Sequence, residues 1–544
     1  MATHEVLNQP PPLRGYNSFD CDRALGEALL REGGGWAADR AHQLGAIAGG
    51  EALDWGVQAN AYPPVLRTHD RYGNRIDEVE FHPAWHRLME LAVGTGLHAL
   101  PWREPRLGGH AARAAMFFVL AQAEAGHGCP ISMTYSAVPA LRIQPELAAE
   151  WEPRFTSTDY DARCIPAAHK RGALCGMAMT EKQGGSDVRA NTTRAEALGA
   201  GGPGGEYAIT GHKWFCSAPM CDAFLVLAHT ERGLTCFLLP RWLPDGTRNR
   251  FHIQRLKDKL GNRSNASSEV EFDRAWARMI GPDGRGVPTI IEMVNHTRLD
   301  CVIGAAAGMR HGVAQAIHHA TYRRAFGKRL VEQPLMQNVL ADLSLESEAA
   351  TAAMMRLARA YDSGRDEREH HFGRIATAVI KYWVCKRLPV HAAEALECLG
   401  GNGYVEESLM PRLYREAPLN SIWEGSGNVM CLDVLRAMAR GPEVVEAFFA
   451  ELDEARSGDR RLDAFAGALR GELGTFDAIE TRARRLVERM ALALQASLLV
   501  RHGDPAVADA FCASRLAGDH GLAFGTLPAG VDCSRIIERA RPAA

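Results

Sequence analysis

The sequence predicts a mainly α-helical protein with a β domain in the middle of the chain, and three observations support this. The chain has 544 residues, which at about 150 residues per domain gives more than three domains. Apolar residues recur with the period of a helix on both sides of a central region. In that region, short β-branched runs alternate with glycine-rich turns. Because strands and helices are segregated along the chain, a mostly parallel sheet is not expected.

The composition is that of an ordinary globular protein. The 62 basic and 65 acidic residues leave a net charge of −3, which excludes a strongly basic nucleic-acid coat and an acidic disordered tail. No apolar run of about 18 residues and no secretory leader pattern is found. The 13 cysteines are scattered without CxxC pairs, which is typical of reduced thiols. We therefore expect a cytoplasmic protein without a membrane segment or a metal site.

The N-terminal third contains an arm and a helical domain. Residues 1–50 form a mixed arm in which the prolines after Asn8 exclude a helix and three glycines at 33–35 make a second break. We expect this arm to be either disordered or docked on a partner subunit. Residues 51–175 form an N-terminal helical domain, in which 111–125 is rich in helix-forming residues.

The rest of the chain divides into a β domain and two helical parts. Residues 176–288 form the β domain, with strands expected at 207–210, 224–228, 235–239 and 269–272. Residues 289–440 form a second helical domain, a four-helix bundle. One stripe of a long buried helix is predicted at Cys301, Ala305, Met309, Val313 and Ile317. Residues 441–544 form a C-terminal helical extension and a candidate DNA-binding region.

Four segments carry residues that could bind a cofactor or move a proton. The first, 178–187, places hydroxyl groups and two glycines in one loop at the entry to the β domain. Glycines let backbone N–H groups approach a ligand closely, and threonine and serine add hydrogen bonds. A polar β-turn without a ligand would have the same composition, and composition alone favours that alternative.

The second and third segments are equally ambiguous by themselves. Residues 211–217 set an aromatic pair beside a hydroxyl group, which suits a flat ring that stacks and makes one polar contact, but an ordinary core strand is the alternative. Residues 397–404 follow a helix rather than a strand, so they are not a Rossmann fingerprint. Alone, they indicate a helix C-terminus with glycine in the left-handed conformation.

The fourth segment, 422–428, holds Glu424 between a tryptophan and a glycine in an apolar stretch. Burial favours the protonated form of a carboxyl group and so makes its carboxylate a stronger base. Abstraction of a weakly acidic C–H proton near neutral pH needs such a base. The alternative is a glutamate in a surface loop, and the segment alone does not separate the two.

Together the four segments resemble the acyl-CoA dehydrogenase family of flavoproteins. Residues 178–190 match the family's first signature, and residues 397–416 match the second, including Glu407, Arg412 and Glu416. The resemblance covers about residues 80–440. It implies the family's fold, which consists of an N-terminal helical domain, a β domain and a second helical domain, and it leaves the C-terminal extension as an addition.

Other features resemble one branch of this family, which is associated with the adaptive response to DNA alkylation and is described as binding DNA. These features are the proline-containing N-terminal arm, the run at 255–267 and the C-terminal extension. The resemblance therefore implies double-stranded DNA as a partner besides an acyl-CoA.

The resemblance also implies FAD as the cofactor, between the β domain and the second helical domain. Thr180 matches the threonine at the pyrimidine edge of the flavin, and Ser217 matches the hydroxyl residue near N5. Arg323 and Phe326 match residues that hold the adenylate half from a neighbouring subunit, so a homotetramer is expected. The implied cofactor-binding residues are Met179, Thr180, Gly185, Ser186, Phe215, Ser217, Arg323, Phe326, Gly401, Trp423 and Asn428.

Glu424 matches the family's catalytic base. A minority of relatives, of the isovaleryl type, carry the base on a long helix, where this chain has Thr297, which cannot take up a proton. The implied reaction moves the α-proton of an acyl thioester to Glu424 and the β-hydride to the flavin. Two departures from the pattern concern the flavin site: Glu397 replaces a glutamine, and Gln333 is displaced by one residue.

Arginines near the C-terminal extension are the candidate DNA contacts, because arginine binds phosphate as a two-pronged donor. They are Arg436, Arg440, Arg482, Arg484, Arg485 and Arg489. From residue 441 onward the chain nevertheless has 13 arginines, no lysine and 16 acidic residues. A basic stripe is therefore compatible with the sequence, and a basic domain is not. A solvated helix with ion pairs is the alternative.

We therefore expect an FAD-dependent acyl-CoA dehydrogenase-type oxidoreductase with Glu424 as base. It would act slowly on a short or branched acyl-CoA such as isovaleryl-CoA and would be linked to the response to DNA alkylation. The alternative is a DNA-binding flavoprotein that protects DNA from alkylation without efficient acyl-CoA turnover.

Overall fold

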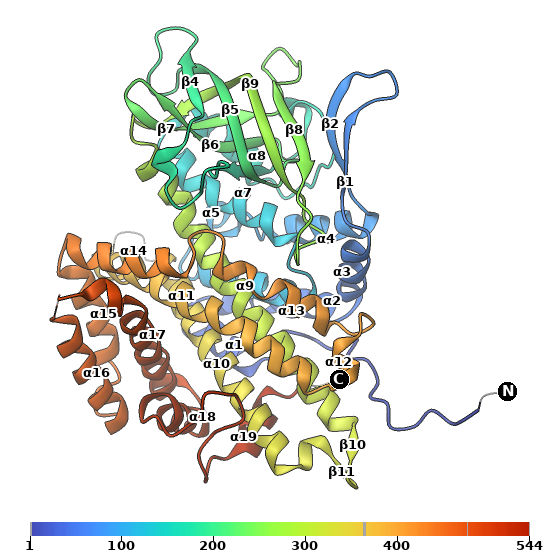
Figure 1. Ribbon diagram of the computed structural model, residues 1–544, viewed down its shortest axis with the longest axis vertical. Helices are drawn as coiled ribbons and strands as arrows, with labels where there is room; N and C mark the ends of the chain where they lie inside the picture. Colours follow the sequence, from blue (N-terminus) through green and yellow to red (C-terminus); the bar gives the residue numbers. More distant parts are fainter. Residues whose placement is uncertain (1–2, 363–365, 476, 543–544) are drawn as a thin grey trace. The chain divides into compact units, whose positions relative to one another are not determined.

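A computed structural model describes residues 3–362, 366–475 and 477–542 (Figure 1). The chain forms two compact units. The helical unit comprises Met1–Leu53, Arg106–Ala123 and Arg298–Ala544, and the β unit comprises Asp54–Pro105 and Glu124–Thr297. Each unit is therefore assembled from segments that lie far apart in the sequence.

The β unit is built on a seven-stranded sheet. Its strands are β3 (Cys175–Ala178), β4 (Arg194–Ala197), β5 (Glu206–Ser217), β6 (Ala223–Thr230), β7 (Gly233–Pro240), β8 (Phe251–Leu256) and β9 (Ser267–Ile280). The pairings run from β3 through β5, β9, β7 and β6 back to β3, so the sheet closes on itself, and closure removes exposed strand edges. All pairs are antiparallel except β3–β6 and β4–β6. The predicted central β domain is thus confirmed.

Helices and a hairpin complete the β unit. They are α3 (Glu51–Ala61), β1 (Val65–His69), β2 (Arg75–Glu80), α4 (Pro83–Gly94), α5 (Leu100–Arg103), α7 (Gly128–Leu141) and α8 (Pro145–Phe155). Leu66 and Val79 of the hairpin pack on the apolar core of the sheet. The Thr134 hydroxyl of α7 accepts a hydrogen bond from Cys175 N at the start of β3, so helix and sheet share one interior.

Long helices form the core of the helical unit. They are α9 (Gly286–Tyr322), which begins in the β unit, α10 (Pro334–Asp362) and α11 (Glu367–Glu397). Shorter helices pack around them: α1 (Arg23–Arg31), α2 (Ala38–Ala48), α6 (Gly109–Ala123), α12 (Gly401–Tyr404), α13 (Met410–Glu416) and α14 (Gly427–Arg440). All five residues of the predicted α9 stripe are buried. The predicted helix at 111–125 corresponds to α6.

The C-terminal extension shares its core with the long helices. It comprises α15 (Glu443–Asp453), α16 (Arg460–Leu473), α17 (Ile479–His502), α18 (Pro505–Phe511) and α19 (Cys533–Ala540). Leu492 and Leu499 of α17 and Ile536 of α19 belong to the same apolar cluster as Ile317 and Leu343. The extension is therefore an integral layer of the helical unit.

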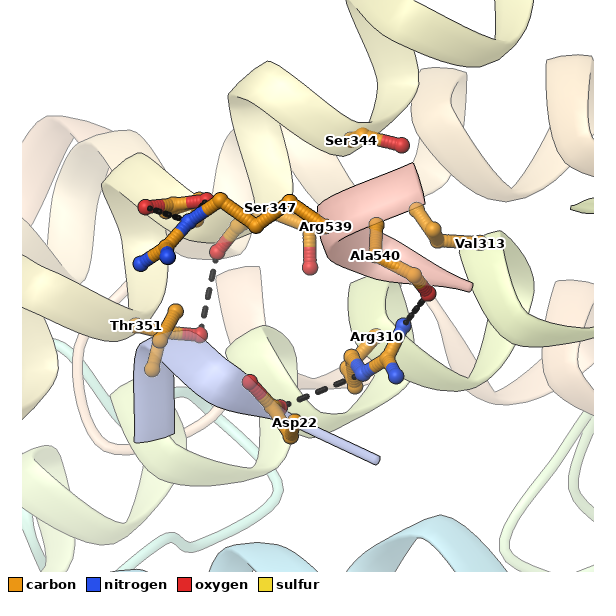
Figure 2. A pocket seen from close by; sticks show the side chains of 10 residues that line it. Asp22, Arg310, Val313, Ser344, Ser347, Thr351, Arg539 and Ala540 are labelled. Atoms are coloured by element: carbon orange, nitrogen blue, oxygen red, sulfur yellow. Dashed lines mark hydrogen bonds and ion pairs between the residues drawn. The ribbon is translucent and has the colours of Figure 1, made fainter. Parts of the chain in front are cut away.

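Buried ion pairs also anchor this extension. Glu451 of α15 accepts hydrogen bonds from Arg356 at 2.7 and 3.0 Å and from Arg501 at 2.8 Å. Figure 2 shows the last helix, where Arg310 of α9 donates to the carbonyl of Ala540 at 2.8 Å and lies 3.2 Å from Asp22. The cavity between these groups has a volume of about 20 Å³, which is room for one water molecule and too small for a substrate.

The N-terminal arm contacts its own chain from Asn8 onward, so the alternative of a disordered arm is wrong for this part, and docking on a partner subunit stays a prediction. It lies on its own chain, because Asn8 forms three hydrogen bonds with Arg323 and Arg324 at 2.6–2.9 Å. Gln9 accepts a hydrogen bond from Asn402, and the carbonyl of Pro11 bonds His318. The prolines exclude a helix, as predicted, but they leave these backbone groups available for docking. Within the described ranges, no helix has the length and apolarity needed to cross a membrane.

Candidate functional site

Strand register gathers one group of predicted residues at a single end of the sheet in the β unit. Met177 pairs with Ser217 in antiparallel register. The same register continues past the end of β3, where Trp214 N donates to the carbonyl of Thr180 at 2.8 Å. Met179 and Thr180 therefore lie beside Phe215 and Ser217. All four had been predicted to contact the flavin.

The loop after β3 brings Gly185 against Thr180. A Cβ atom added at Gly185 would lie 2.4 Å from the Thr180 hydroxyl oxygen, so only glycine permits this approach. The loop thus presents the hydroxyl groups of Thr180 and Ser186, and the adjoining strand presents Ser217. Phe215 has 49% of its surface exposed and supplies an aromatic face. This set of donors with one aromatic ring fits a flavin.

Glu181 organises this loop, although the sequence analysis gave it no role. Its side chain is fully buried and accepts hydrogen bonds from Gln183, from both the amide and the hydroxyl of Thr192, and from the amide of Thr193 at 2.7–3.2 Å. The ammonium group of Lys213, also fully buried, donates to Glu181 at 2.8 Å and to the carbonyl of Leu227. One carboxylate therefore ties both ends of the loop to β5.

The electrostatics of this pair keep both groups charged at neutral pH. Burial lowers the pKa of Lys213 to about 8, although the Glu181 carboxylate opposes the shift. Burial alone would raise the pKa of Glu181, but the Lys213 ammonium outweighs it and holds that pKa well below its usual range. The loop is thus fixed by an ion pair that no solvent screens.

Glu424 and its neighbours form a second group, in the helical unit. Glu424 is half-buried and has a positive φ of 58°, a left-handed conformation that disfavours any residue with a Cβ. The next residue is Gly425, with φ of 104°. The Trp423 indole donates to Asn420 at 2.8 Å, and Asn428 is exposed at the start of α14.

Two buried cations hold the backbone around Glu424. Arg298 donates to the carbonyl of Glu424 at 3.1 Å and to the carboxylate of Asp433 at 2.8 Å. Lys381 donates to the carbonyls of Trp423, at 2.7 Å, and Gly425. Thr297, at the alternative base position, is buried and donates its hydroxyl to Val294. The loop is therefore constrained through three consecutive carbonyl groups.

A third group lies at the far end of α9. Arg323 precedes the hairpin of β10 (Arg324–Ala325) and β11 (Lys328–Arg329). At its tip, Phe326 has φ of 50° and 98% of its surface exposed. Gln333, the displaced glutamine, donates to the carbonyl of Ala325 at 2.9 Å and supports the hairpin.

The family's second signature, at residues 397–416, lies near this hairpin. Gly400 has φ of 59°, which is the predicted left-handed helix end, and Gly401 begins α12. Because the adjacent arm residues Asn8 and Gln9 bind Arg323 and Asn402 respectively, the arm links the hairpin to α12. Glu397 is exposed beside them.

Two of the six candidate DNA-binding arginines bind groups of the chain itself. Arg482 donates to the carbonyls of Thr475 and Asp477, and Arg489 pairs with Glu472 at 3.3 Å. Arg484 and Arg485 of α17 are exposed, and so are Arg436 and Arg440 of α14.

Arg436 and Arg440 lie at the other end of α14 from Arg484. The Arg484 guanidinium lies by Gly427, the first residue of α14. Arg436 and Arg440 follow roughly 14 and 20 Å along that helix.

Family models match most of the chain in three segments. The model described as the adaptive response protein AidB N-terminal domain matches residues 8–162. The acyl-CoA dehydrogenase middle domain matches residues 176–275, and the acyl-CoA dehydrogenase C-terminal domain matches residues 284–439.

Individual relatives match over nearly the whole length. AidB of Escherichia coli (strain K12) is 46% identical over 513 residues, which is 94% of each chain. The solved structure of Caenorhabditis elegans ACDH-11 in complex with C11-CoA is 26% identical, with a TM-score of 0.86 over 98% of each chain. An acyl-CoA dehydrogenase complexed with FAD from Bacillus anthracis shares the fold, with 18% identity and a TM-score of 0.63 over 79% of this chain and 80% of its own.

Proposed function

The chain belongs to the acyl-CoA dehydrogenase family, and from this premise we propose that it is an FAD-containing oxidoreductase acting on a short or branched acyl-CoA similar to isovaleryl-CoA. Glu424 is the base that takes the α-proton, and turnover is slow. The similarity to AidB supports a link to the adaptive response to DNA alkylation. The structure of a full-length relative with C11-CoA supports an acyl-CoA as substrate.

The observation that carries the proposal is the backbone of Glu424. A left-handed conformation at a residue other than glycine costs of order 1–3 kcal/mol and persists only when surrounding groups enforce it. Here Arg298 and Lys381 enforce it. Such strain is concentrated at functional sites, where it fixes the direction of a side chain. A glutamate held in this way is suited to meet an α-carbon in one orientation.

The residues of the β unit fit the cofactor. The hydroxyl groups of Thr180, Ser186 and Ser217 would bind its polar edges, and Phe215 would cover a flat face. When bound, FAD supplies the acceptor for the β-hydride of the thioester. Glu181 and Lys213 hold the loop that makes these contacts.

The positions of Arg298 and Arg323 support a site shared between two copies. Arg298 lies on α9, and Arg323 directly follows the last residue of that helix, so the 25 residues between them span roughly 37 Å. Arg298 binds the carbonyl of Glu424, so Arg323 and Phe326 are too far away to hold the dinucleotide that serves that glutamate. In this proposal, they hold the adenylate half of a neighbouring subunit's cofactor in a homotetramer.

An absorbance spectrum under anaerobic conditions tests the proposal. The purified protein should show an oxidised flavin spectrum that is bleached by added isovaleryl-CoA. A flavin that stays oxidised with isovaleryl-CoA and with other short and branched acyl-CoA thioesters would contradict dehydrogenation.

Double-stranded DNA is a second candidate ligand, favoured by the exposed pair Arg484 and Arg485. Of the 13 arginines after residue 440, nine form ion pairs within the described ranges. Neither member of the exposed pair is among them. Because most of these arginines stabilise the extension itself, any DNA contact is confined to few phosphates, and its affinity should be weak and salt-dependent. In a homotetramer, four such contacts would raise the overall affinity for DNA.

Charge reversal tests this second candidate. Replacing both residues, Arg484→Glu with Arg485→Glu, should abolish binding of a labelled duplex in an anisotropy titration at low salt. Arg436→Glu with Arg440→Glu tests the other exposed candidate pair in the same titration, and Glu424→Gln should leave binding intact. Unchanged affinity after reversal of Arg484 and Arg485 would exclude them as the contact.

A further inference from the structure

Lys381 lies directly against the backbone that carries Glu424. Its side chain extends from α11 and has 1% of its surface exposed. The ammonium group donates to the carbonyls of the residues on either side of the glutamate, Trp423 and Gly425. We infer that Lys381 is a positioning residue that fixes the orientation of the catalytic base. This inference rests on the proposed function.

The other buried lysines of the chain have a different environment. Lys213 is paired with Glu181 at 2.8 Å, and Lys170 with Asp222 at 2.7 Å. Among the residues that the structure describes, no carboxylate lies within ion-pair distance of Lys381, and its recorded acceptors are the two carbonyls. Burying an ammonium group without a counter-ion costs several kcal/mol, and an apolar side chain of the same length would avoid that cost. Stability alone therefore does not account for a lysine here.

Neighbouring groups do not neutralise this charge. Burial raises the pKa of Cys385, one turn along α11, to about 12, even though Lys381 opposes the shift. Burial likewise raises the pKa of Cys301 well above its usual value, so both thiols stay neutral. Arg298, in contrast, forms an ion pair with Asp433, which Arg374 also binds. The hydrogen bonds that the structure describes for Lys381 go to backbone carbonyls.

The geometry explains what those hydrogen bonds do. Because each peptide unit is planar, the direction of a carbonyl fixes the plane of its whole unit. Lys381 fixes the plane before Glu424, and Arg298 fixes the plane after it. Together they determine φ and ψ of Glu424, and Lys381 also holds the following unit through Gly425. Without Lys381, Glu424 can relax to negative φ. Its carboxylate then turns away from the direction in which the two cations hold it.

The substitution Lys381→Met tests this role, because methionine keeps most of the apolar stem and removes the ammonium group. The first readout is the exchange of the α-protons of isovaleryl-CoA for deuterium by the holoenzyme in D₂O, which reports the base alone. A carboxylate displaced by about 1 Å loses roughly 10²-fold in rate. We expect exchange and kcat to fall by about this factor, while KM and FAD content stay unchanged. A variant that failed to fold would instead change the exchange rate, kcat, KM and the FAD content together.

The second readout does not depend on turnover. Amide hydrogen exchange measured by mass spectrometry should rise in the peptide spanning 419–430 and remain unchanged elsewhere. Arg368→Met is the matched control, because Arg368 lies on the same helix with an exposed side chain that pairs with Glu454 and not with the 419–430 segment. Lys381→Gln, whose amide can still donate, should recover part of the lost rate, and it replaces Lys381→Met if that variant does not fold.

The outcomes separate this inference from the proposed function. If the wild type neither exchanges α-protons nor bleaches with acyl-CoA, the proposed function fails, and the catalytic part of the inference fails with it. If the wild type is active and Lys381→Met matches Arg368→Met in proton exchange and in protection of 419–430, the inference is overturned and the proposed function stands.

Discussion

At the scale of single residues, Glu424 combines a strained backbone with a chemical role. Its φ of 58° suits glycine better than any other residue. We predict that Glu424→Gly is more stable than Glu424→Gln by about 1 kcal/mol, as measured by urea denaturation, and that both variants are inactive. Equal stability of the two variants would show that the left-handed backbone is not enforced in solution.

The ion pair of Glu181 and Lys213 gives a second prediction at this scale. Glu181→Gln leaves a buried ammonium group without its counter-ion, which costs about 3 kcal/mol, and it loosens the loop that holds Thr180 and Gly185. The variant should melt at a lower temperature and retain less FAD after gel filtration. Adding Lys213→Met should restore most of the stability and not the FAD retention. If the single variant kept full FAD content, the loop would not depend on this pair.

At the scale of secondary-structure elements, the extension is fixed by Glu451 of α15. Burial alone would raise the pKa of Glu451, but Arg356 and Arg501 outweigh it and lower that pKa to about 2. The carboxylate therefore stabilises the fold fully above its unfolded pKa of about 4.5, and this contribution is lost as the pH falls from about 4.5 to 2.

Glu451→Gln tests this account of the extension. We predict a loss of about 3 kcal/mol in unfolding free energy at pH 7, and a difference from wild type that shrinks below pH 4.5. Urea denaturation at a series of pH values measures both. Glu454→Gln is the control, because Glu454 follows Glu451 by three residues and its side chain is more exposed than that of Glu451. A pH-independent difference would mean that the ion pairs do not supply the stability.

The elements themselves could be predicted from the sequence, because their signals are local. The stripe from Cys301 to Ile317 is visible in the sequence as a helical period, and the strand at 224–228 is visible as a continuous apolar run. The docked arm could not be predicted, because Asn8 binds the guanidinium group of Arg323 and backbone groups of Arg324, more than 300 residues away. Proline excluded a helix there but carried no information about a docking partner.

The same limit applies to the candidate site. The segments 178–187, 211–217 and 422–428 marked Thr180, Gly185, Ser217 and Glu424 from their neighbours in sequence. The role of Lys381 could not be predicted, because its acceptors are backbone carbonyl groups. Every residue has such a group, so the sequence does not indicate which ones a lysine will bind. Glu181 lay within the first motif, yet its role appears only when β5 brings Lys213 to it.

At the scale of the whole molecule, the account requires at least two copies of the chain for each cofactor. Arg323→Ala and Glu424→Gln should each be inactive alone. A mixed oligomer places an intact Glu424 beside an intact Arg323 of the neighbour. We predict that activity returns when the two variants are mixed and allowed to exchange subunits. No recovery after demonstrated exchange would contradict the shared site.

The central claim is that Glu424 removes the α-proton. The most direct measurement is the rate of anaerobic flavin bleaching by isovaleryl-CoA in the wild type and in Glu424→Gln, at equal FAD content. The account predicts a rate lower by about 10²–10⁴-fold in the variant, with an unchanged oxidised spectrum. A variant that bleaches at the wild-type rate would show that another group is the base.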